Sequence, residues 1–261
     1  MGIQPPIINI FEKAVRKAGK ILIRDFKEVE NLQIQSKSLG NFVTSADLKS
    51  EKIIIETLQY YYPDYTYRSE ERSDISGDKD HIIIIDPIDG TTNFIHGIPV
   101  FGIVIAKLFK NEIQDGVIFN PITNDFFWSS KGQGAWCNNT RLRVSKRENI
   151  EDSIIGFDIL HSKQMYKNYL NEIDQLAKQY TGLRNMGSAS INLAYTAAGK
   201  LDAYWGRNLN LWDVSSGILL VTEAGGKISK PSGENWDINS TDILASNGYI
   251  HQKMIQNLLI K

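Results

Sequence analysis

The chain has 261 residues, of which 42% are hydrophobic, so it can bury a substantial core and suits one domain or two fused lobes better than several modules. Its formal net charge of -1 provides no overall positive field to gather nucleic acid, so direct nucleic-acid binding is not expected. The single Cys137 excludes an intramolecular disulfide and a thiolate zinc site, which suits the reducing cytoplasm.

The first half of the chain contains two helix patterns followed by a series of strand patterns. Residues 7–26 carry the apolar stripe of an amphipathic helix. A second helix is expected to begin near Ser45, a suitable N-cap, and to end in segment 60–63. Residues 81–85 are almost wholly apolar and β-branched, which indicates a strand buried on both faces that ends at Asp86. Four further segments predict an antiparallel meander: 99–108, 113–119, 125–129 and 141–145.

The second half mixes strands with longer helices. We expect strands at 153–158 and 201–205 and near 227 and 243, and helices at 163–179, 188–198, 213–224 and from 249 onward. This order predicts sheets covered by helices, and the absence of repeats and linkers gives no firm domain boundary. There is no signal-peptide pattern and no apolar run near the roughly 20 residues that span a bilayer, so we expect a soluble cytoplasmic protein.

The segment directly after the buried strand is the most informative part of the chain. Residues 86–94 read Asp-Pro-Ile-Asp-Gly-Thr-Thr-Asn-Phe, which places Asp86 and Asp89 three positions apart at a strand end. If a helical turn starts near Gly90, the free backbone NH groups of Gly90, Thr91 and Thr92 form an anion site. The segment therefore offers carboxylates for a cation and amides for a phosphate.

Electrostatics indicates how the carboxylates and the phosphate-binding amides of this segment can work together. A carboxylate about 4 Å from a phosphate charge is repelled by roughly 4 kcal/mol at an effective dielectric constant near 20, so cations must lie between them. Ligands made only of oxygen favour Mg²⁺ over zinc or copper. The four histidines are scattered without ligand spacing, and we interpret all of them as non-ligands: His81, His96, His161 and His251.

Each of these residues also has an ordinary structural interpretation. Residues 86–93 consist largely of turn-forming types, and spacing alone does not distinguish a loop from a binding site. Asp213 could be a carboxylate favoured only by a helix dipole, and Glu70 lies in a charged run, 68–80, that is typical of a solvated loop.

A resemblance to a known family separates these alternatives. Residues 86–94, together with Leu-Trp-Asp-Val-Ser-Ser-Gly at 211–217, resemble the paired signature of the inositol monophosphatase family. Residues 41–47 resemble the upstream valine-threonine-aspartate motif of this family, and 69–71 resemble its glycine-glutamate-glutamate motif. The motifs occur in the order and spacing of the family. Further similarity at 184–198 and 222–226 extends the resemblance over nearly the whole chain.

The resemblance implies roles for individual residues. It implies that two or three Mg²⁺ ions bind per active site, with Asp86 bridging two of them. The implied metal ligands are Glu70, Asp86, the carbonyl of Ile88, Asp89 and Asp213. The implied catalytic residues are Asp47, Glu70 and Thr91, of which Thr91 and Asp47 would orient and activate the attacking water. The implied substrate-binding residues are Ile88, Asp89, Gly90, Thr91, Thr92, Arg184, Gly187 and Asp213.

The resemblance also implies an architecture and an activity. We expect an α/β (α+β) fold, a layered α-β-α-β-α sandwich, with residues 1–261 forming one domain of two lobes, about 1–145 and 146–261. The expected activity is Mg²⁺-dependent hydrolysis of inositol monophosphate or a similar small phosphorylated metabolite, by a homodimer. Fructose bisphosphate, 3'-phosphoadenosine 5'-phosphate, histidinol phosphate and NADP are alternative substrates. A regulatory role with the transcription machinery is an alternative of another class.

Two departures from the family pattern bear on these expectations. Ser69, Ser215 and Ser216 replace other small residues, so these departures have little effect on the expected site. Gly206 stands where many inositol-cleaving relatives have a glutamate that contacts substrate hydroxyls, so one polyol contact is missing. The next residue, Arg207, could recruit a second anionic group or could face water, and we favour the second interpretation.

Overall fold

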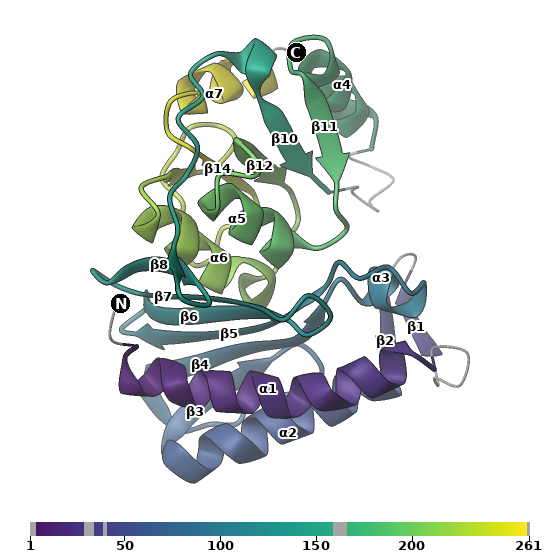
Figure 1. The fold of residues 1–261 in the computed structure, drawn as a ribbon, viewed down its shortest axis with the longest axis vertical. Helices are drawn as coiled ribbons and strands as arrows, with labels where there is room; N and C mark the ends of the chain where they lie inside the picture. The colour runs from purple at the N-terminus through teal and green to yellow at the C-terminus, as the bar shows by residue number, and fades with distance from the viewer. Residues whose placement is uncertain (1–3, 29–33, 39–40, 159–165, 260–261) are drawn as a thin grey trace.

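A computed structural model describes residues 4–28, 34–38, 41–158 and 166–259. Helices and sheets alternate in five layers, so the predicted α-β-α-β-α sandwich is confirmed (Figure 1). The helices are α1 (Pro6–Phe26), α2 (Ser45–Tyr61), α3 (Thr91–Ile95), α4 (Tyr166–Ala177), α5 (Ala189–Ala197), α6 (Leu211–Glu223) and α7 (His251–Leu259). A short 3-10 helix covers Ile150–Asp152, and a separate hairpin is formed by β1 (Ile34–Ser38) and β2 (Asn41–Thr44).

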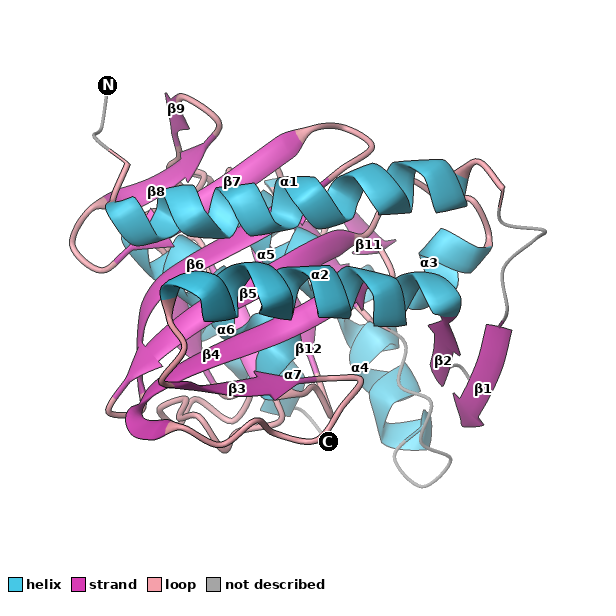
Figure 2. Ribbon diagram, turned by 90° about the horizontal axis from the view of Figure 1, so that it is seen from below, coloured by secondary structure: helices cyan, strands magenta, loops and turns pink. Residues whose placement is uncertain are grey.

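The larger sheet has seven strands in the order β3-β4-β5-β6-β7-β8-β9. Its strands are β3 (Tyr65–Ser69), β4 (Asp78–Asp89), β5 (Gly102–Phe109), β6 (Glu112–Asn120), β7 (Asp125–Ser130), β8 (Gly134–Cys137) and β9 (Thr140–Arg141). Strand β3 pairs parallel to β4, and the remaining pairs are antiparallel. Helices α1 and α2 lie across one face of this sheet (Figure 2).

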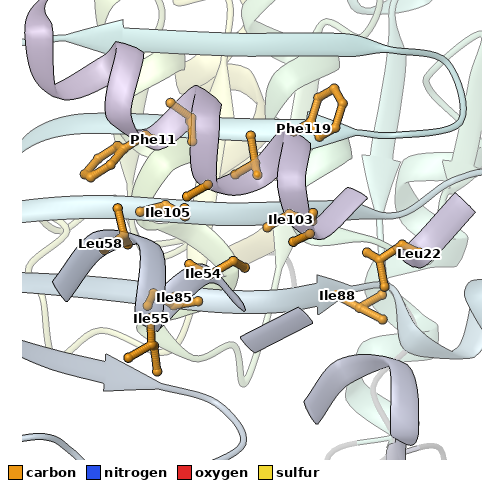
Figure 3. Close-up of a cluster of buried hydrophobic side chains, with 14 of the residues drawn as sticks. Phe11, Leu22, Ile54, Ile55, Leu58, Ile85, Ile88, Ile103, Ile105 and Phe119 are labelled. Atoms are coloured by element: carbon orange, nitrogen blue, oxygen red, sulfur yellow. The ribbon is translucent and has the colours of Figure 1, made fainter. Parts of the chain in front are cut away.

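The interface between these two helices and the sheet is the largest hydrophobic core. Phe11 of α1 and Leu58 of α2 are fully buried against Ile85 and Ile105 of the sheet (Figure 3). Ile88, in the segment that carries the two aspartates, packs into the same cluster. This core, on the α1 and α2 side of the sheet, therefore holds the backbone of residues 86–89 in place.

Helices α5 and α6 form the middle layer, and α6 packs on the face of the larger sheet opposite α1. The smaller sheet has the order β11-β10-β12-β14-β13. Its strands are β10 (Ile154–Phe157), β11 (Gly182–Asn185), β12 (Ala203–Gly206), β13 (Lys227–Ser229) and β14 (Ile243–Ser246). Strands β10, β11 and β12 run parallel, and α4 and α7 cover the outer face of the sheet.

Some predicted elements are corrected by the structure. The predicted strand 141–145 is wrong, because only β9 pairs there; Leu142 and Val144 alternate because both pack into the middle core, without a strand partner. The buried strand is longer than 81–85 and includes both aspartates. The second helix begins at Ser45, but its N-cap is Thr44. Strand β3 includes only the first two residues of the charged run 68–80, whose ordinary interpretation is a solvated loop.

The structure tests two further expectations only in part or not at all. The start of the predicted helix 163–179 lies outside the described residues, and α4 covers the rest of it. The division into two lobes near residue 145 stays a prediction. Among the helices in the described ranges, none is long and apolar enough to cross a membrane.

Candidate active site

An irregularity at the end of β4 positions the first two aspartates. Opposite β5, Asp86 pairs with Val104 and Asp89 with Gly102, so β4 carries one extra residue at this point. Such bulges bend a strand and redirect its side chains, and they are frequent next to active sites. The amide of Ile88 donates to Oδ1 of Asp86 at 2.9 Å, which fixes the Asp86 carboxylate over the bulge.

The third aspartate comes from the middle layer. Asp213 lies in the first turn of α6, where its Oδ2 accepts from the amide of Asn210 at 2.7 Å. Asp213 is a carboxylate at a helix N-terminus, as the helix-dipole interpretation expects. It also belongs to a cluster with Asp86 and Asp89. The carboxylate oxygens of these three residues lie within 4.8 Å of one another.

Asp86 and Asp89 are buried and Asp213 is half-buried, and the charges of the three carboxylates repel one another. Burial and the carboxylates of Glu70, Asp89 and Asp213 raise the pKa of Asp86 well above its usual range. Burial and the charge of Asp89 do the same for the pKa of Asp213. Burial also raises the pKa of Asp89, against the hydrogen bonds from Ser188 and Ser190. Glu70, which follows β3, is thus close enough to join this acidic group.

These residues fit a hard divalent cation. The donor set consists of carboxylate oxygens, which Mg²⁺ prefers. In the described part of the chain, no lysine or arginine forms an ion pair with any of the three aspartates. Buried charges of one sign need a counter-charge, and a divalent cation would supply it.

Another carboxylate, that of Asp47, lies outside the cluster and is paired with a hydroxyl. Asp47 is fully buried in the first turn of α2, where Thr44 donates to its Oδ2 through its amide at 2.7 Å and its hydroxyl at 2.6 Å. The hydroxyl of Thr91 shares its one proton between Oδ1 of Asp47, at 3.3 Å, and the carbonyl of Ile88, at 2.9 Å. Burial raises the pKa of Asp47 to about 6, which suits a group that accepts a proton near neutral pH.

The short helix α3 begins beside this pair, as the sequence predicts for a turn near Gly90. Gly90 has φ = 96°, and a Cβ there would meet the carbonyl oxygens of Val100 at 3.1 Å and Gly187 at 3.2 Å. Asn93 donates to the carbonyls of Val100 and Met186, at 2.7 Å each, which holds the segment before α5 against α3. The structure therefore brings Gly187 next to Gly90, with Thr92 exposed in the first turn.

Asp89 connects the cluster to α5, a link that our sequence reasoning missed. The hydroxyl of Ser188 and the amide of Ser190 donate to Oδ2 of Asp89 at 2.6 and 2.7 Å, and the amide of Ala189 donates to Oδ1 at 3.3 Å. Asp89 thus accepts from the free amides at the start of α5, which are otherwise unpaired. Ser188, a good N-cap type before a helix pattern, was the available signal.

In the part of the chain that the structure describes, Arg184 and Arg207 form no ion pair with the three aspartates. Arg184 is exposed on β11, its guanidinium donates to the carbonyl of Leu183, and in the described residues it forms no ion pair with the aspartates. Arg207 does not simply face water, since it is bound to Glu172 through two nitrogens at 2.6 and 3.0 Å and to Asp242 at 2.8 Å. Its carboxylate partners come from neighbouring elements, and the alternative that it binds a second anionic group stays a prediction.

Glu51 is a further residue that our sequence reasoning missed. It lies one turn after Asp47 on α2 and is 1% exposed. Its Oε1 accepts from the hydroxyl of Ser69 and from the amide of Glu71 at 3.2 Å, and its Oε2 accepts from Arg72 at 2.5 Å. These contacts flank Glu70 on both sides, so Glu51 ties the Glu70 segment to the helix that carries Asp47. Ser69 supplies a hydroxyl that a glycine would lack.

Replacing Glu51 by alanine is expected to lower the free energy of unfolding by about 2 kcal/mol, because hydrogen bonds to a charged group are lost. It should also weaken Mg²⁺ binding, because Glu70 loses its support. Urea unfolding and Mg²⁺ titration by calorimetry measure the two effects. Glu56→Ala, an exposed change on the same helix, is the matched control and should shift stability by less than about 0.5 kcal/mol. Unchanged stability and Mg²⁺ affinity in Glu51→Ala would contradict this role.

The chain is similar to known proteins over nearly its whole length. The model of the inositol monophosphatase family matches residues 4–261. An inositol-1-monophosphatase of Caulobacter vibrioides is 43% identical and covers 94% of this chain and 98% of its own. A Nus factor SuhB of Pseudomonas aeruginosa is 37% identical, with coverages of 93% and 92%. The crystal structure of extragenic suppressor protein suhB from Bartonella henselae matches with a TM-score of 0.95 and 40% identity, over 98% of this chain and 99% of that chain.

Proposed function

The chain belongs to the inositol monophosphatase family, and we propose that it hydrolyses the phosphate monoester of a small polyol, first of all an inositol monophosphate, in the presence of Mg²⁺. As a member of this family it is a phosphatase. The observation that carries the proposal is the group of Asp86, Asp89 and Asp213, whose carboxylate oxygens lie within 4.8 Å of one another.

In the proposed site, Asp86, Asp89, Asp213, Glu70 and the carbonyl of Ile88 hold two or three Mg²⁺ ions. Their oxygen-only chemistry and the raised pKa values of the aspartates support this ligand set. Bound there, the cations would polarise the phosphoryl oxygens and lower the pKa of a coordinated water.

The residues of the chain then orient the reaction. Thr91 and Asp47 hold the attacking water, and Asp47 accepts its proton, which agrees with a pKa of about 6 and the hydrogen bond between these side chains. Glu70 assists, and its effect on the pKa of Asp86 supports its place in the site. The free amides of Gly90, Thr91 and Thr92 bind the phosphate as it is attacked in line. Gly187 and Arg184 complete the proposed substrate contacts, Gly187 through its position beside Gly90.

The ion pairs of Arg207 bear on the choice of substrate. A bisphosphate or a nucleotide with a second phosphate needs a further cationic group, and Arg207 is already bound to Glu172 and Asp242. This favours a substrate with one phosphate and a neutral remainder over fructose bisphosphate, 3'-phosphoadenosine 5'-phosphate and NADP. Histidinol phosphate remains a candidate within the one-phosphate class.

A substrate panel tests this proposal. Purified protein with Mg²⁺ is assayed for phosphate release from inositol 1-phosphate, histidinol phosphate, fructose 1,6-bisphosphate, 3'-phosphoadenosine 5'-phosphate and NADP. We expect the highest kcat/KM for inositol 1-phosphate. A higher value for any of the others assigns the enzyme to that substrate, and equal rates on all compounds would defeat a narrow assignment.

A second function in transcription is favoured by one observation, the 37% identity to a protein named Nus factor SuhB. We propose it as an addition to hydrolysis, because a protein used only for binding would not need the acidic cluster. A homodimer and a cytoplasmic location are proposed with it. Asp86→Asn in the host cell separates the roles: loss of hydrolysis with an unchanged cellular phenotype indicates regulation, whereas loss of both indicates catalysis.

A further inference from the structure

Asp158 is a half-buried residue near the proposed active site, and the proposed reaction gives its carboxyl group no role. We propose that Asp158, oriented by the hydroxyl of Tyr204, binds a hydroxyl group of the substrate and so selects polyol phosphates over phosphates of plain alcohols. The inference rests on the proposed function, since it names the part of the site that recognises the polyol.

The register of the smaller sheet places Asp158 at the substrate side. Strands β10 and β12 are parallel neighbours, with Gly156 opposite Tyr204 and Phe157 opposite Trp205. Asp158 therefore follows β10 beside Gly206, the last residue of β12. Ligands in open α/β sheets bind outside the carboxyl ends of parallel strands. Asp158 and Gly206 both lie at that edge.

A short chain of contacts joins Asp158 to the acidic cluster. The amide nitrogen of Asn192 donates to Oδ1 of Asp158 at 3.3 Å and to the carbonyl of Ser188 at 2.9 Å. The hydroxyl of Ser188 donates in turn to Asp89 at 2.6 Å. The charge of Asp89 is close enough to raise the pKa of Asp158. A substrate bound at Asp89 is thus within reach of Asp158 through its alcohol part.

Gly206 cannot supply the contact, because its side-chain position is occupied. A Cβ at residue 206 would lie 2.6 Å from the hydroxyl oxygen of Tyr204 and 2.6 Å from a methyl carbon of Leu209. That Tyr204 hydroxyl donates to Oδ2 of Asp158. The missing polar side chain at 206 and the pair of Tyr204 with Asp158 are therefore one arrangement, in which the carboxylate comes from the neighbouring strand.

Asp158 retains capacity for a ligand. Its two oxygens offer about four acceptor positions, of which Tyr204 and Asn192 use one each. The residue as a whole is half-buried. Burial raises its pKa to about 7, so near neutral pH it can accept from or donate to a hydroxyl. Burial holds the pKa of Tyr204 above its usual range, which keeps that hydroxyl a donor.

The test compares inositol 1-phosphate with cyclohexyl phosphate, which has the same ring without the hydroxyl groups. For Asp158→Ala and Asp158→Asn, we expect the ratio of kcat/KM for inositol 1-phosphate to that for cyclohexyl phosphate to fall 10- to 100-fold relative to the unmodified protein. Tyr204→Phe, which keeps the ring and removes only the hydroxyl, should lower the ratio in the same direction by a smaller factor. If the Asp158 variants do not fold, the ratio measured for Tyr204→Phe tests the proposed role of Asp158.

Tyr180→Phe is the matched control, since Tyr180 is a buried tyrosine of the same half of the chain whose hydroxyl accepts from Asn257 instead. It should leave the ratio within about twofold. An unchanged ratio in the Asp158 variants, an equal loss on both substrates, or a weakened response to Mg²⁺ in calorimetry would each overturn the assignment of Asp158. If the unmodified protein cleaves both phosphates equally well, the polyol part of the proposed function fails, whatever the variants do.

Discussion

Replacing Asp86 by asparagine is expected to lower kcat/KM by about a thousandfold, about 4 kcal/mol of barrier, and yet to stabilise the metal-free protein. Asp86 is the carboxylate on which Glu70, Asp89 and Asp213 all act. Without a cation, its charge only adds repulsion to a buried cluster. The neutral amide removes that repulsion, so we expect the melting temperature of the metal-free protein to rise by about 2–4 °C.

Phosphate release and thermal unfolding in EDTA measure the two effects of Asp86→Asn. Asp202→Asn is the matched control, because Asp202 is also fully buried but accepts from Ser145 at 2.5 Å and pairs with Arg147 at 3.0 Å. Its loss of charge should lower the melting temperature, since an arginine then loses its partner. A lowered melting temperature of metal-free Asp86→Asn would show that the cluster is not repulsive.

Removal of Mg²⁺ is expected to abolish hydrolysis and to leave a protein whose stability falls as the pH rises. The pKa values of Asp86, Asp89 and Asp213 lie above their usual value, and that of Asp47 is about 6. Between the ordinary and the raised pKa values, the folded state binds more protons than the unfolded state. The free energy of unfolding of the metal-free protein therefore decreases as pH rises through this window.

Mg²⁺ should reverse this trend, because the cation replaces the protons on the cluster. We expect the rise in melting temperature on adding Mg²⁺ to be larger at about pH 8 than at about pH 5. Differential scanning calorimetry with Mg²⁺ and with EDTA at both pH values measures it. A Mg²⁺ effect of equal size at both pH values, or hydrolysis that survives EDTA, would refute the proposed ligand set.

The layered fold could be predicted because its elements carry local patterns. The amphipathic stripe of α1 and the β-branched run of β4 each reflect the face that they bury, as the packing of Leu22 and Ile85 in one core shows. The strand predicted at 141–145 failed for the converse reason. Leu142 and Val144 alternate like a strand, but their burial in the middle layer, without a pairing strand, produces that pattern.

The structure also brings Asp86, Asp89 and Asp213 together, as the sequence predicts for this site. It leaves the predicted roles of Glu70, Thr92, Arg184 and Gly187 as proposals, because these depend on ligands. The support of Glu70 by Glu51 could not be predicted. In the sequence, Glu51 is one charged residue among several on α2, and only its burial against Ser69 and Arg72 distinguishes it.

The sequence by itself determined the order of groups in residues 86–94, because a β-branched run, two aspartates three positions apart, a glycine and two threonines follow one another within one continuous segment. Only the tertiary structure decided which distant groups meet there. Ser188 reaches Asp89 from 99 positions away, and Arg207 finds Glu172 and Asp242, each 35 positions distant. Hydrogen bonds and ion pairs act over a few ångströms, so their partners depend on where strands and helices end in space, which residue type alone does not encode.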